Sequence, residues 1–374
     1  MPRNQAAWMA VKHQPLQVKE APYTEPGPGE VLVRNHAVAI NPVDWAIPFF
    51  GGMMFSWIKY PFVLGSDLAG EVVAVGEGVT TVKPGDRVLA MAAGMVKQRA
   101  RSAEGAFQAY SIVLPQLTTI IPDQISYVDA SVIPLGITTA ACGLFQSDLL
   151  ALERPVANPP MRDQWVLIMG GATSVGANAI QLAVAAGYSV LTTSSPKNFA
   201  LVTSLGAAQA FDYHSKTLVA DMAAALQGKE VVGALAIGAG SASDSLDILS
   251  QCQGRKFVAS CSAPISLDAV AEGSRITLGA ILKVLPAMMR GRMHTRAKSR
   301  RYGIVEKFYD ASSVVDNEIG PAIYQDYLGA ALAEGRFRPA PPATVVGSSL
   351  NDIQKAFDIQ RRGVSATKIV VALE

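Results

Sequence analysis

A run of apolar residues followed by a glycine-rich turn marks the middle of the chain. Residues 165–169 are all apolar and run into Gly170 and Gly171, and after Gly176 the apolar residues recur at helical spacing. A buried strand that turns sharply into a helix has this pattern. The free amides at such a helix start attract phosphate groups. The pattern therefore predicts a strand, a phosphate-binding turn and a helix.

Further apolar runs alternate with helical stretches downstream. Strands are predicted at 188–193, 207–213, 233–237 and 255–259. This alternation favours an α/β fold with a parallel, doubly wound sheet. Gly171 and Gly176 fill the first and third glycine positions of a dinucleotide-binding fingerprint, and Thr173 stands at the middle one. Because one glycine is missing, an ordinary turn of an unrelated α/β domain is the alternative at this point.

The first 130 residues or so follow a different pattern. Strand-like runs at 29–39 and 68–75 are separated by turns rich in glycine and proline, which indicates a mostly β region. With 374 residues the chain exceeds one typical domain, so we expect two. Near the other end, 318–335 is predicted to be a helix and 368–373 a strand that returns to the first sheet.

Composition narrows the class of protein. Half of the residues are apolar and only 17% are charged, which is typical of a compact globular protein. The net charge of +2 favours neither nucleic acid nor an anionic membrane as a partner. The exception is the basic run 290–301, which we interpret as a solvated helix face or loop, with an acidic partner protein as the alternative.

The cysteines, histidines and apolar stretches indicate the cellular compartment of the protein and whether its sequence has metal-binding or membrane-spanning patterns. Cys142, Cys252 and Cys261 are odd in number, so we expect no disulfide framework and a reducing compartment. The four histidines lack metal-ligand spacing. Apolar stretches are interrupted before membrane-spanning length and the first residues do not form a signal peptide. We therefore expect a cytoplasmic protein with no membrane span.

The loop after the second predicted strand bears on the cofactor. An NAD-binding fold usually has an acidic residue there, which binds the ribose 2′-hydroxyl. This loop reads Ser194-Ser-Pro-Lys-Asn198 instead. Hydroxyls and a lysine suit a 2′-phosphate, so the loop favours NADPH as the cofactor. An ordinary polar loop is the alternative.

Several motifs in the first half occur in a fixed order before this dinucleotide fold. They cover 28–33, 39–44, 64–76, 82–88 and 105–110. On these motifs the chain resembles the medium-chain dehydrogenase/reductase superfamily over essentially its whole length. The resemblance implies a GroES-like catalytic domain over 1–130, completed by 336–374, and a Rossmann NADP-binding domain over 131–335.

Within that superfamily the sequence departs from the zinc alcohol dehydrogenases. Those enzymes carry a zinc-ligating His after the glycine of a Gly-His-Glu motif, whereas Ser66 and Asp67 follow Gly65 here, and no cysteine precedes Cys142. The sequence is similar instead to the zinc-independent branch, which includes quinone reductases, alkenal reductases and the trans-acting enoyl reductases of fungal polyketide clusters. The resemblance implies that no metal is bound.

The resemblance to the fungal group also implies ligand-binding positions. NADPH is expected against Val43, Asp44, Trp45, Ala46, Ala172, Thr173, Ser174, Val175, Ser195, Pro196, Lys197, Asn198, Tyr213, Arg338 and Pro339. The substrate is expected against Ile137, Thr138, Thr139, Leu144, Thr277, Leu278, Gly279 and Ala280. The apolar, Met-rich segment that follows, 280–289, is either helix core or the wall of an apolar acyl-binding cleft.

Without a metal, hydride transfer depends on positioning and on donors aimed at the oxygen that becomes negative. Asn41, Asp44 and Thr139 are the candidate catalytic residues. Turn geometry for Asn41 and helix capping for Asp44 are the structural alternatives.

The leading hypothesis is NADPH-dependent reduction of an activated C=C bond in an apolar enone or acyl substrate that resembles a polyketide. A quinone or simple carbonyl reductase is the nearest alternative, and a non-catalytic NADPH-binding regulator belongs to a different class. A carrier protein is a further candidate partner. The protein is expected to be a monomer or a homodimer.

Overall fold

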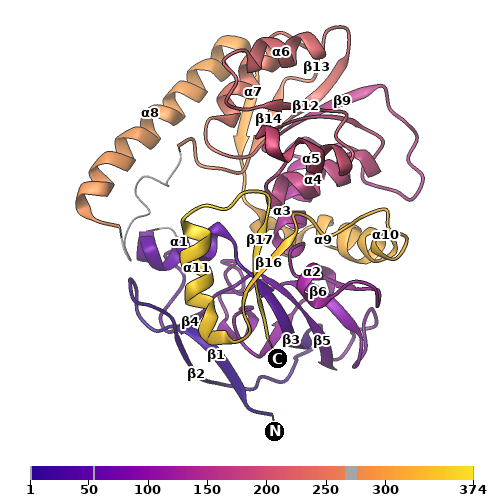
Figure 1. Cartoon of the computed structure of the whole chain (residues 1–374). Coiled ribbons are helices and arrows are strands. Elements are labelled where there is room, and N and C mark those ends of the chain that lie inside the picture. The colour runs from indigo at the N-terminus through magenta and orange to yellow at the C-terminus, as the bar shows by residue number, and fades with distance from the viewer. Residues whose placement is uncertain (1, 54, 266–275, 374) are drawn as a thin grey trace. The chain divides into compact units, whose positions relative to one another are not determined.

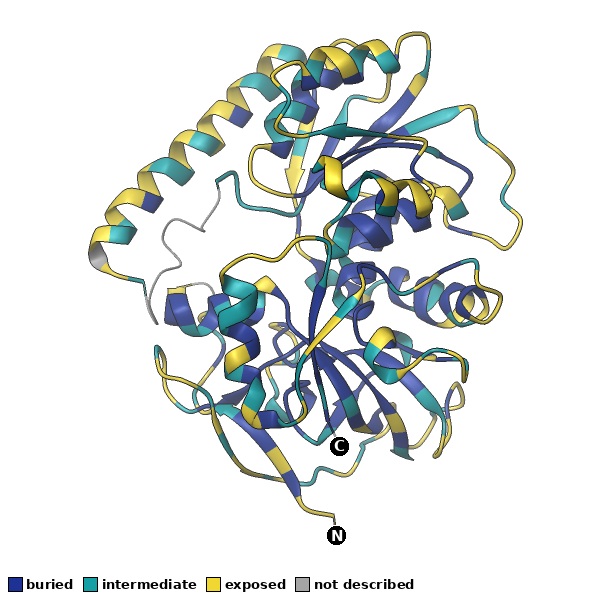
Figure 2. Cartoon of the chain, in the orientation of Figure 1, coloured by how far each residue is buried: buried dark blue, intermediate teal, exposed yellow. Residues whose placement is uncertain are grey.

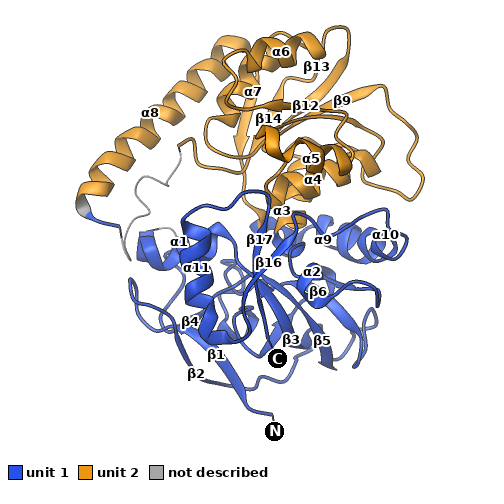
Figure 3. Cartoon of the chain, in the orientation of Figure 1, with its two compact units in different colours: residues 1–135, 268–277, 312–374 blue, residues 136–267, 278–311 orange. Residues whose placement is uncertain are grey.

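A computed structural model describes residues 2–53, 55–265 and 276–373. The chain divides into two compact units (Figure 3). Unit 1 comprises Met1–Leu135, Asp268–Thr277 and Ser312–Glu374, and unit 2 comprises Gly136–Leu267 and Leu278–Ala311. Unit 1 is built mostly on antiparallel β-structure and unit 2 on a parallel sheet with helices, so the predicted α/β fold class is confirmed.

The sheet of unit 2 has the strand order β11-β10-β9-β12-β14-β15, and every pairing in it is parallel (Figure 1). Its strands are β9 (Gln164–Met169), β10 (Ser189–Ser194), β11 (Gln209–Asp212), β12 (Glu230–Ala236), β14 (Phe257–Ser260) and β15 (Val305–Phe308), with β13 (Gln253–Gly254) beside β12. The connecting helices are α3 (Pro134–Phe145), α4 (Ser174–Ala185), α5 (Phe199–Ser204), α6 (Leu218–Ala225), α7 (Ser241–Leu249) and α8 (Leu278–Tyr302).

Burial on both faces explains the continuous apolar run in β9. Val166, Leu167 and Ile168 are all fully buried, although successive side chains of a strand point to opposite faces (Figure 2). A parallel sheet covered by helices on both sides buries its central strands in this way. The doubly wound sheet predicted from the sequence is therefore confirmed.

The main sheet of unit 1 has the order β16-β17-β3-β5-β6-β8, with β7 beside β3, and a smaller sheet has the order β2-β1-β4. Its strands are β1 (Asn4–Met9), β2 (Gln17–Ala21), β3 (Val31–Ala39), β4 (Phe62–Val63), β5 (Asp67–Val75), β6 (Arg87–Met91), β7 (Tyr110–Val113), β8 (Thr118–Ile120), β16 (Ala343–Gly347) and β17 (Lys368–Ala372). Its helices include α1 (Pro42–Phe50), α2 (Tyr127–Ala130) and α11 (Ile353–Arg361). Because β17 pairs with β3, the predicted return of the tail to this sheet is confirmed.

The helix predicted at 318–335 forms as α9 (Ile319–Ile323), a π-helical turn (Tyr324–Leu328) and α10 (Gly329–Ala333). The sequence-based boundaries placed this segment in the nucleotide-binding domain, but it lies in unit 1. The buried Tyr324 explains the difference, since its hydroxyl donates to Pro134 O at 2.9 Å and its carbonyl accepts from Thr119 Oγ1. This segment therefore belongs to the last stretch of the first unit, which begins at Ser312.

Helix α8 carries the apolar segment 280–289 and the basic run 290–301. Its apolar residues Leu282, Leu285 and Met289 are more than half exposed, whereas Val284 is buried (Figure 2). The helix-core interpretation of this segment is therefore wrong for those three side chains. The interpretation of the basic run as a solvated helix face agrees with the exposure of most of its arginines.

One stretch in the described part of the chain, Tyr127–Phe145, is long and apolar enough to meet the length and hydropathy criteria for a membrane span, with a mean hydropathy of 1.5. In the structure 78% of that stretch is buried, which is also typical of a core helix in a globular protein.

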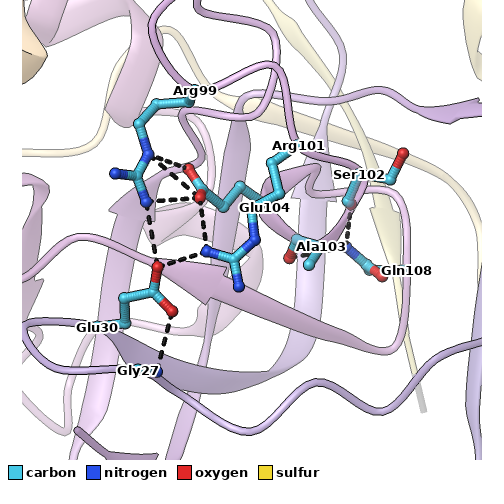
Figure 4. A network of polar contacts seen from close by, with 8 residues as sticks. All are labelled: Gly27, Glu30, Arg99, Arg101, Ser102, Ala103, Glu104 and Gln108. Atoms are coloured by element: carbon cyan, nitrogen blue, oxygen red, sulfur yellow. Dashed lines mark hydrogen bonds and ion pairs between the residues drawn. The ribbon is translucent and has the colours of Figure 1, made fainter. Parts of the chain in front are cut away.

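A charge network joins two distant segments of unit 1 (Figure 4). The carboxylate of Glu104 is fully buried and accepts from Arg99 Nε and Nη2 at distances of 2.6–3.2 Å. Arg99 and Arg101 also bind Glu30, at 3.1 and 2.5 Å. The network holds the loop around 99–105 against the start of β3.

Removing the charge of Glu104 is expected to destabilise unit 1. In Glu104→Gln, Arg99 and Arg101 lose a buried partner but remain partly exposed to water, so we expect the free energy of unfolding to fall by about 2 kcal/mol. Urea denaturation followed by circular dichroism measures the change. The control is Asp358→Asn, which breaks an ion pair whose carboxylate is 40% exposed and which should cost at most about 0.5 kcal/mol. Equal losses in the two variants would contradict the structural role of the network.

Candidate active site

The turn between β9 and α4 requires glycine at the two positions that the fingerprint predicted. A Cβ on Gly171 would lie 2.2 Å from Thr192 Oγ1, and a Cβ on Gly176 would lie 2.2 Å from Gly170 O. Gly170 has φ of 82°, a conformation that other residues rarely adopt. The backbone therefore folds back on itself here without side chains in the way.

Thr173, which stands at the missing middle glycine, is the N-cap of α4. Its hydroxyl accepts from Gly176 N at 3.0 Å and donates to Gly170 O at 2.8 Å. The amides of Ser174 and Val175 donate to no group among the described residues. A helix start with free amides and a capping side chain is a phosphate-binding site. This turn can hold a diphosphate despite the substituted glycine.

The loop after β10 lies beside this turn at the same edge of the sheet, because β9 and β10 are adjacent and parallel. Ser195 Oγ donates to Tyr213 OH at 3.3 Å, which brings together two of the predicted cofactor-binding residues. Lys197 is exposed, and no ion pair joins it to a described carboxylate. Ser194 Oγ is buried without a hydrogen-bond partner in the described part of the chain.

A buried polar cluster lies at the start of α1 in unit 1. Lys368 Nζ contacts Asn41 Oδ1 at 2.5 Å and Asp67 Oδ2 at 2.8 Å, and Asn41 Nδ2 donates to Asp67 Oδ2 at 2.8 Å. The other Asp67 oxygen accepts from Leu135 N at 2.6 Å. All three side chains are less than 5% exposed. The buried cation is therefore matched by one carboxylate and one amide oxygen.

Asp44 is the second acid of this region and is fully buried. Its Oδ2 accepts from Asn41 N at 2.7 Å, as a cap of α1 does, while its Oδ1 has no partner among the described residues. The pKa of Asp44 is raised to about 8, chiefly because burial disfavours its charged form. The hydrogen bond from Asn41 and the charge of Lys368 lower this pKa, and the nearby Asp67 carboxylate raises it. Asp44 therefore holds a proton at neutral pH.

The remaining cofactor positions of unit 1 occupy two places. Val43, Trp45 and Ala46 lie on the first turns of α1, where Trp45 Nε1 donates to Gln360 Oε1 at 2.5 Å. Arg338 and Pro339 lie between α10 and β16. In unit 2, Ala172 and Pro196–Asn198 lie in the two loops described above. Contact of these residues with a cofactor stays a prediction.

The predicted substrate residues lie on two helices. Ile137, Thr138 and Leu144 on α3 are buried, whereas Thr139 is only partly buried. Thr139 O accepts from the buried Tyr309 OH at 2.8 Å. Thr277, Gly279 and Ala280 lie at the start of α8, and the side chain of Leu278 lies outside the described residues. Of the α3 positions, Thr139 has the most accessible side chain.

Sequence reasoning missed the partnership of Asp67 and Lys368. In the sequence, Asp67 stands in the motif that lacks a zinc-ligating histidine, and Lys368 is the first residue of a predicted strand. No local signal connects them, because they lie some 300 positions apart and meet through sheet pairing. Among the described residues, no three His, Cys, Asp or Glu side chains come together as metal ligands. Metal independence stays a prediction.

Comparison with known proteins gives consistent matches. The alcohol dehydrogenase GroES-like domain family matches residues 27–123. The chain is 49% identical to the dehydrogenase pigH of Monascus ruber over 100% of both chains. It is 32% identical to the trans-enoyl reductase himH of Aspergillus japonicus over 99% of this chain and 97% of that one. The solved CurK enoyl reductase shares the fold, with a TM-score of 0.73 over 100% of both chains at 18% identity.

The raised pKa of Asp44 predicts a pH dependence of stability. From about pH 4 to about pH 8 the folded protein keeps a proton that the unfolded chain has lost, so this group makes the free energy of unfolding fall as pH rises, by up to roughly 1.4 kcal/mol per pH unit. Asp44→Asn cannot titrate. The variant should therefore gain stability relative to the wild type between about pH 5 and pH 8, and no further above that range.

Chemical denaturation of both proteins across this pH range measures the difference. A control variant, Asp123→Asn, removes an exposed carboxylate of unit 1 and should follow the wild-type pH profile. A constant difference between Asp44→Asn and the wild type at all pH values would show that Asp44 titrates as an ordinary carboxylate.

Proposed function

This chain belongs to the medium-chain dehydrogenase/reductase superfamily, and we propose that it is an NADPH-dependent reductase of activated C=C bonds, an enoyl or enone reductase. The observation that carries the proposal is the pair of loops at the carboxyl edge of β9 and β10, one with free amides for a diphosphate and one with Ser195 and Lys197 for a 2′-phosphate. Relatives named trans-enoyl reductases support the choice of a C=C bond over a carbonyl.

The residues of unit 2 fit the phosphates of NADPH. Ser174 and Val175 offer amides to the diphosphate, because the glycine turn leaves their approach clear. Ser195, Lys197 and Tyr213 are assigned to the 2′-phosphate, with Ser195 and Tyr213 already in hydrogen-bond contact. The absence of an acidic residue from 194–198 removes the partner that NAD would need. Bound NADPH supplies a hydride for the β-carbon of the substrate.

The chemical work left to the protein is to stabilise the oxygen that becomes negative and to manage one proton. We assign the hydroxyl of Thr139 as the donor to the enolate oxygen, since it is the most accessible of the predicted α3 residues. Asp44 keeps a proton at neutral pH and is assigned as a neutral acid near the start of α1.

Asn41 is assigned a positioning role. Its amide nitrogen donates to Asp67 and its amide oxygen accepts from Lys368, so the side chain is held in one orientation by two buried partners. Its position fixes the backbone from which α1 begins, and α1 carries Val43–Ala46. This favours the structural alternative for Asn41 over direct contact with the substrate.

The proposed substrate is an apolar enone or enoyl compound, and the proposed reaction is zinc-independent. Ser66 supplies no metal ligand at the position of the zinc-ligating histidine, and the carboxylate of Asp67 is already bound by Lys368. A hydroxyl and an ion-paired carboxylate are poor substitutes for the thiolate and imidazole ligands that zinc prefers.

Replacing Lys197 tests the cofactor assignment. A charge-assisted hydrogen bond is worth about 1.5–3 kcal/mol, so Lys197→Ala should weaken NADPH binding by roughly 10- to 150-fold and leave NADH binding nearly unchanged. The control Lys229→Ala removes a lysine that packs on Trp165 near the amino end of β9. Fluorescence titration gives the dissociation constants. Equal affinity of the wild type for NADPH and NADH would refute the assignment.

Replacing Thr139 tests the proposed donor. Thr139→Val keeps the shape of the side chain and should lower kcat for a medium-chain enone by about 10- to 100-fold, because the enolate loses a hydrogen bond. Thr139→Ser keeps the hydroxyl and should recover most of the rate.

Steady-state assays are run on protein dialysed against a strong chelator, which should not change the wild-type rate. Equal rates for Val and wild type would assign Thr139 to packing alone, and loss of activity on dialysis would refute metal independence.

A further inference from the structure

Unit 2 contains a cavity on the β12 and β14 side of its parallel sheet. It has a volume of about 690 Å³ and lies where β12 and β14 end, next to the start of α7 and one side of α8. The strand order places β12 and β14 on the opposite side of β9 from β10 and its ribose-phosphate loop. The cavity therefore occupies the other half of the edge at which parallel sheets bind ligands.

We propose that this cavity binds an organic anion, a compound with a carboxylate or phosphate group, through Arg292, Arg296 and Arg300 of α8. These three arginines line the cavity at intervals of four residues, so they project from one side of the helix. The proposal concerns a separate binding site and does not depend on the reductase activity.

The charge of α8 is the first observation that supports it. The helix holds seven of the 32 lysines and arginines of the chain and no aspartate or glutamate. The rest of the chain then has 25 basic and 30 acidic residues, so an excess of positive charge is concentrated on this one element of a nearly neutral protein. Such a concentration attracts anions.

The second observation is that this charge is only partly compensated. Lys298 Nζ, on the side of α8 that packs against α7, binds Asp247 Oδ2 at 2.6 Å and Ser243 Oγ at 2.7 Å. By contrast, within the described part of the chain no carboxylate lies within ion-pair distance of Arg292, Arg296 or Arg300. Three guanidinium groups on one cavity wall therefore remain available to a ligand.

The two acidic residues that line the same cavity are fewer than its three arginines and offset their charge only in part. Glu306 accepts from Ser260 Oγ at 2.5 Å and so is held by a neutral partner on the strand wall. Asp244 lies in the first turn of α7, where burial raises its pKa. The wall formed by α8 remains net positive at neutral pH.

The size and the remaining walls indicate an organic ligand rather than a simple ion. A volume near 690 Å³ falls within the range of about 300–1,000 Å³ that is usual for small-molecule sites. Phe308 and Pro264 provide apolar surface for a carbon skeleton. Ser241 and Ser262 are engaged with the backbone of Gly238, which leaves the arginines as the strongest donors. A carboxylate or phosphate group attached to a carbon chain matches this combination.

Calorimetric titration tests the proposal on the full chain saturated with NADPH, so that the phosphate turn is occupied. The two probes are octanoate, which represents a carboxylate on a carbon chain, and inorganic pyrophosphate, which represents a phosphate group. We expect one of them to bind the wild type, and the one that binds identifies the anion. The measured heat does not require turnover, so the result is independent of whether the enone assays succeed.

The variant Arg292→Gln/Arg296→Gln/Arg300→Gln should weaken that binding at least tenfold. The matched control, Lys283→Gln/Arg290→Gln/Arg301→Gln, removes the same charge from the same helix at positions that do not line the cavity, and should change binding no more than about twofold. If circular dichroism shows that the triple variant does not fold, Arg296→Gln alone is tested instead, and it should also weaken binding. Failure of both probes to bind the wild type, or equal losses in the two triple variants, would overturn the proposal.

Discussion

The buried ammonium group of Lys368 is the constraint on which the organisation of unit 1 depends. A lysine that is only 3% exposed is unfavourable unless its charge is matched, and here the carboxylate of Asp67 and the amide oxygen of Asn41 match it. These residues begin β17, begin β5 and follow β3. The pairing of β3 with both other strands brings them together, since Ala39 lies opposite Asp67 on one side and Val370 on the other. The C-terminal strand thus fixes the start of α1.

This arrangement has a chemical consequence for Asp44. Among the described residues, the one cation of the cluster is bound to Asp67, so no counter-charge contacts the second carboxylate, Asp44. Protonation of Asp44 at neutral pH leaves the region with one ion pair and one neutral acid. The structural need to balance charge therefore produces a protonated acid on the helix that carries the predicted cofactor residues of unit 1.

In unit 2, the sequence predicted what depends on local rules. The strand over 165–169 and the turn at 170–176 could be predicted because a strand buried on both faces must be apolar throughout and because two positions have no room for a Cβ. Ser195 and Tyr213 lie close together because they follow β10 and β11, which are adjacent and parallel.

What depends on distant parts of the chain could not be predicted. In the sequence, Lys368 looks like any lysine that precedes an apolar strand. Its partners, Asn41 and Asp67, lie far away along the chain. The apolar residues of α8 have the spacing of a core helix, and only the structure shows that Leu282 and Met289 are exposed. Likewise, the helical pattern of 318–335 does not reveal which sheet it packs against, and Tyr324 decides this through Pro134 and Thr119.

In the proposed reaction, hydride from NADPH reaches a carbon–carbon double bond. NADPH that carries deuterium at its hydride-donating carbon tests this most directly, with a medium-chain enone as substrate and the position of the label in the product determined by nuclear magnetic resonance. If hydride reaches the double bond, the product is a saturated ketone with one deuterium on the carbon β to the carbonyl. An alcohol with deuterium on the former carbonyl carbon, or no labelled product while NADPH binds tightly, would contradict it.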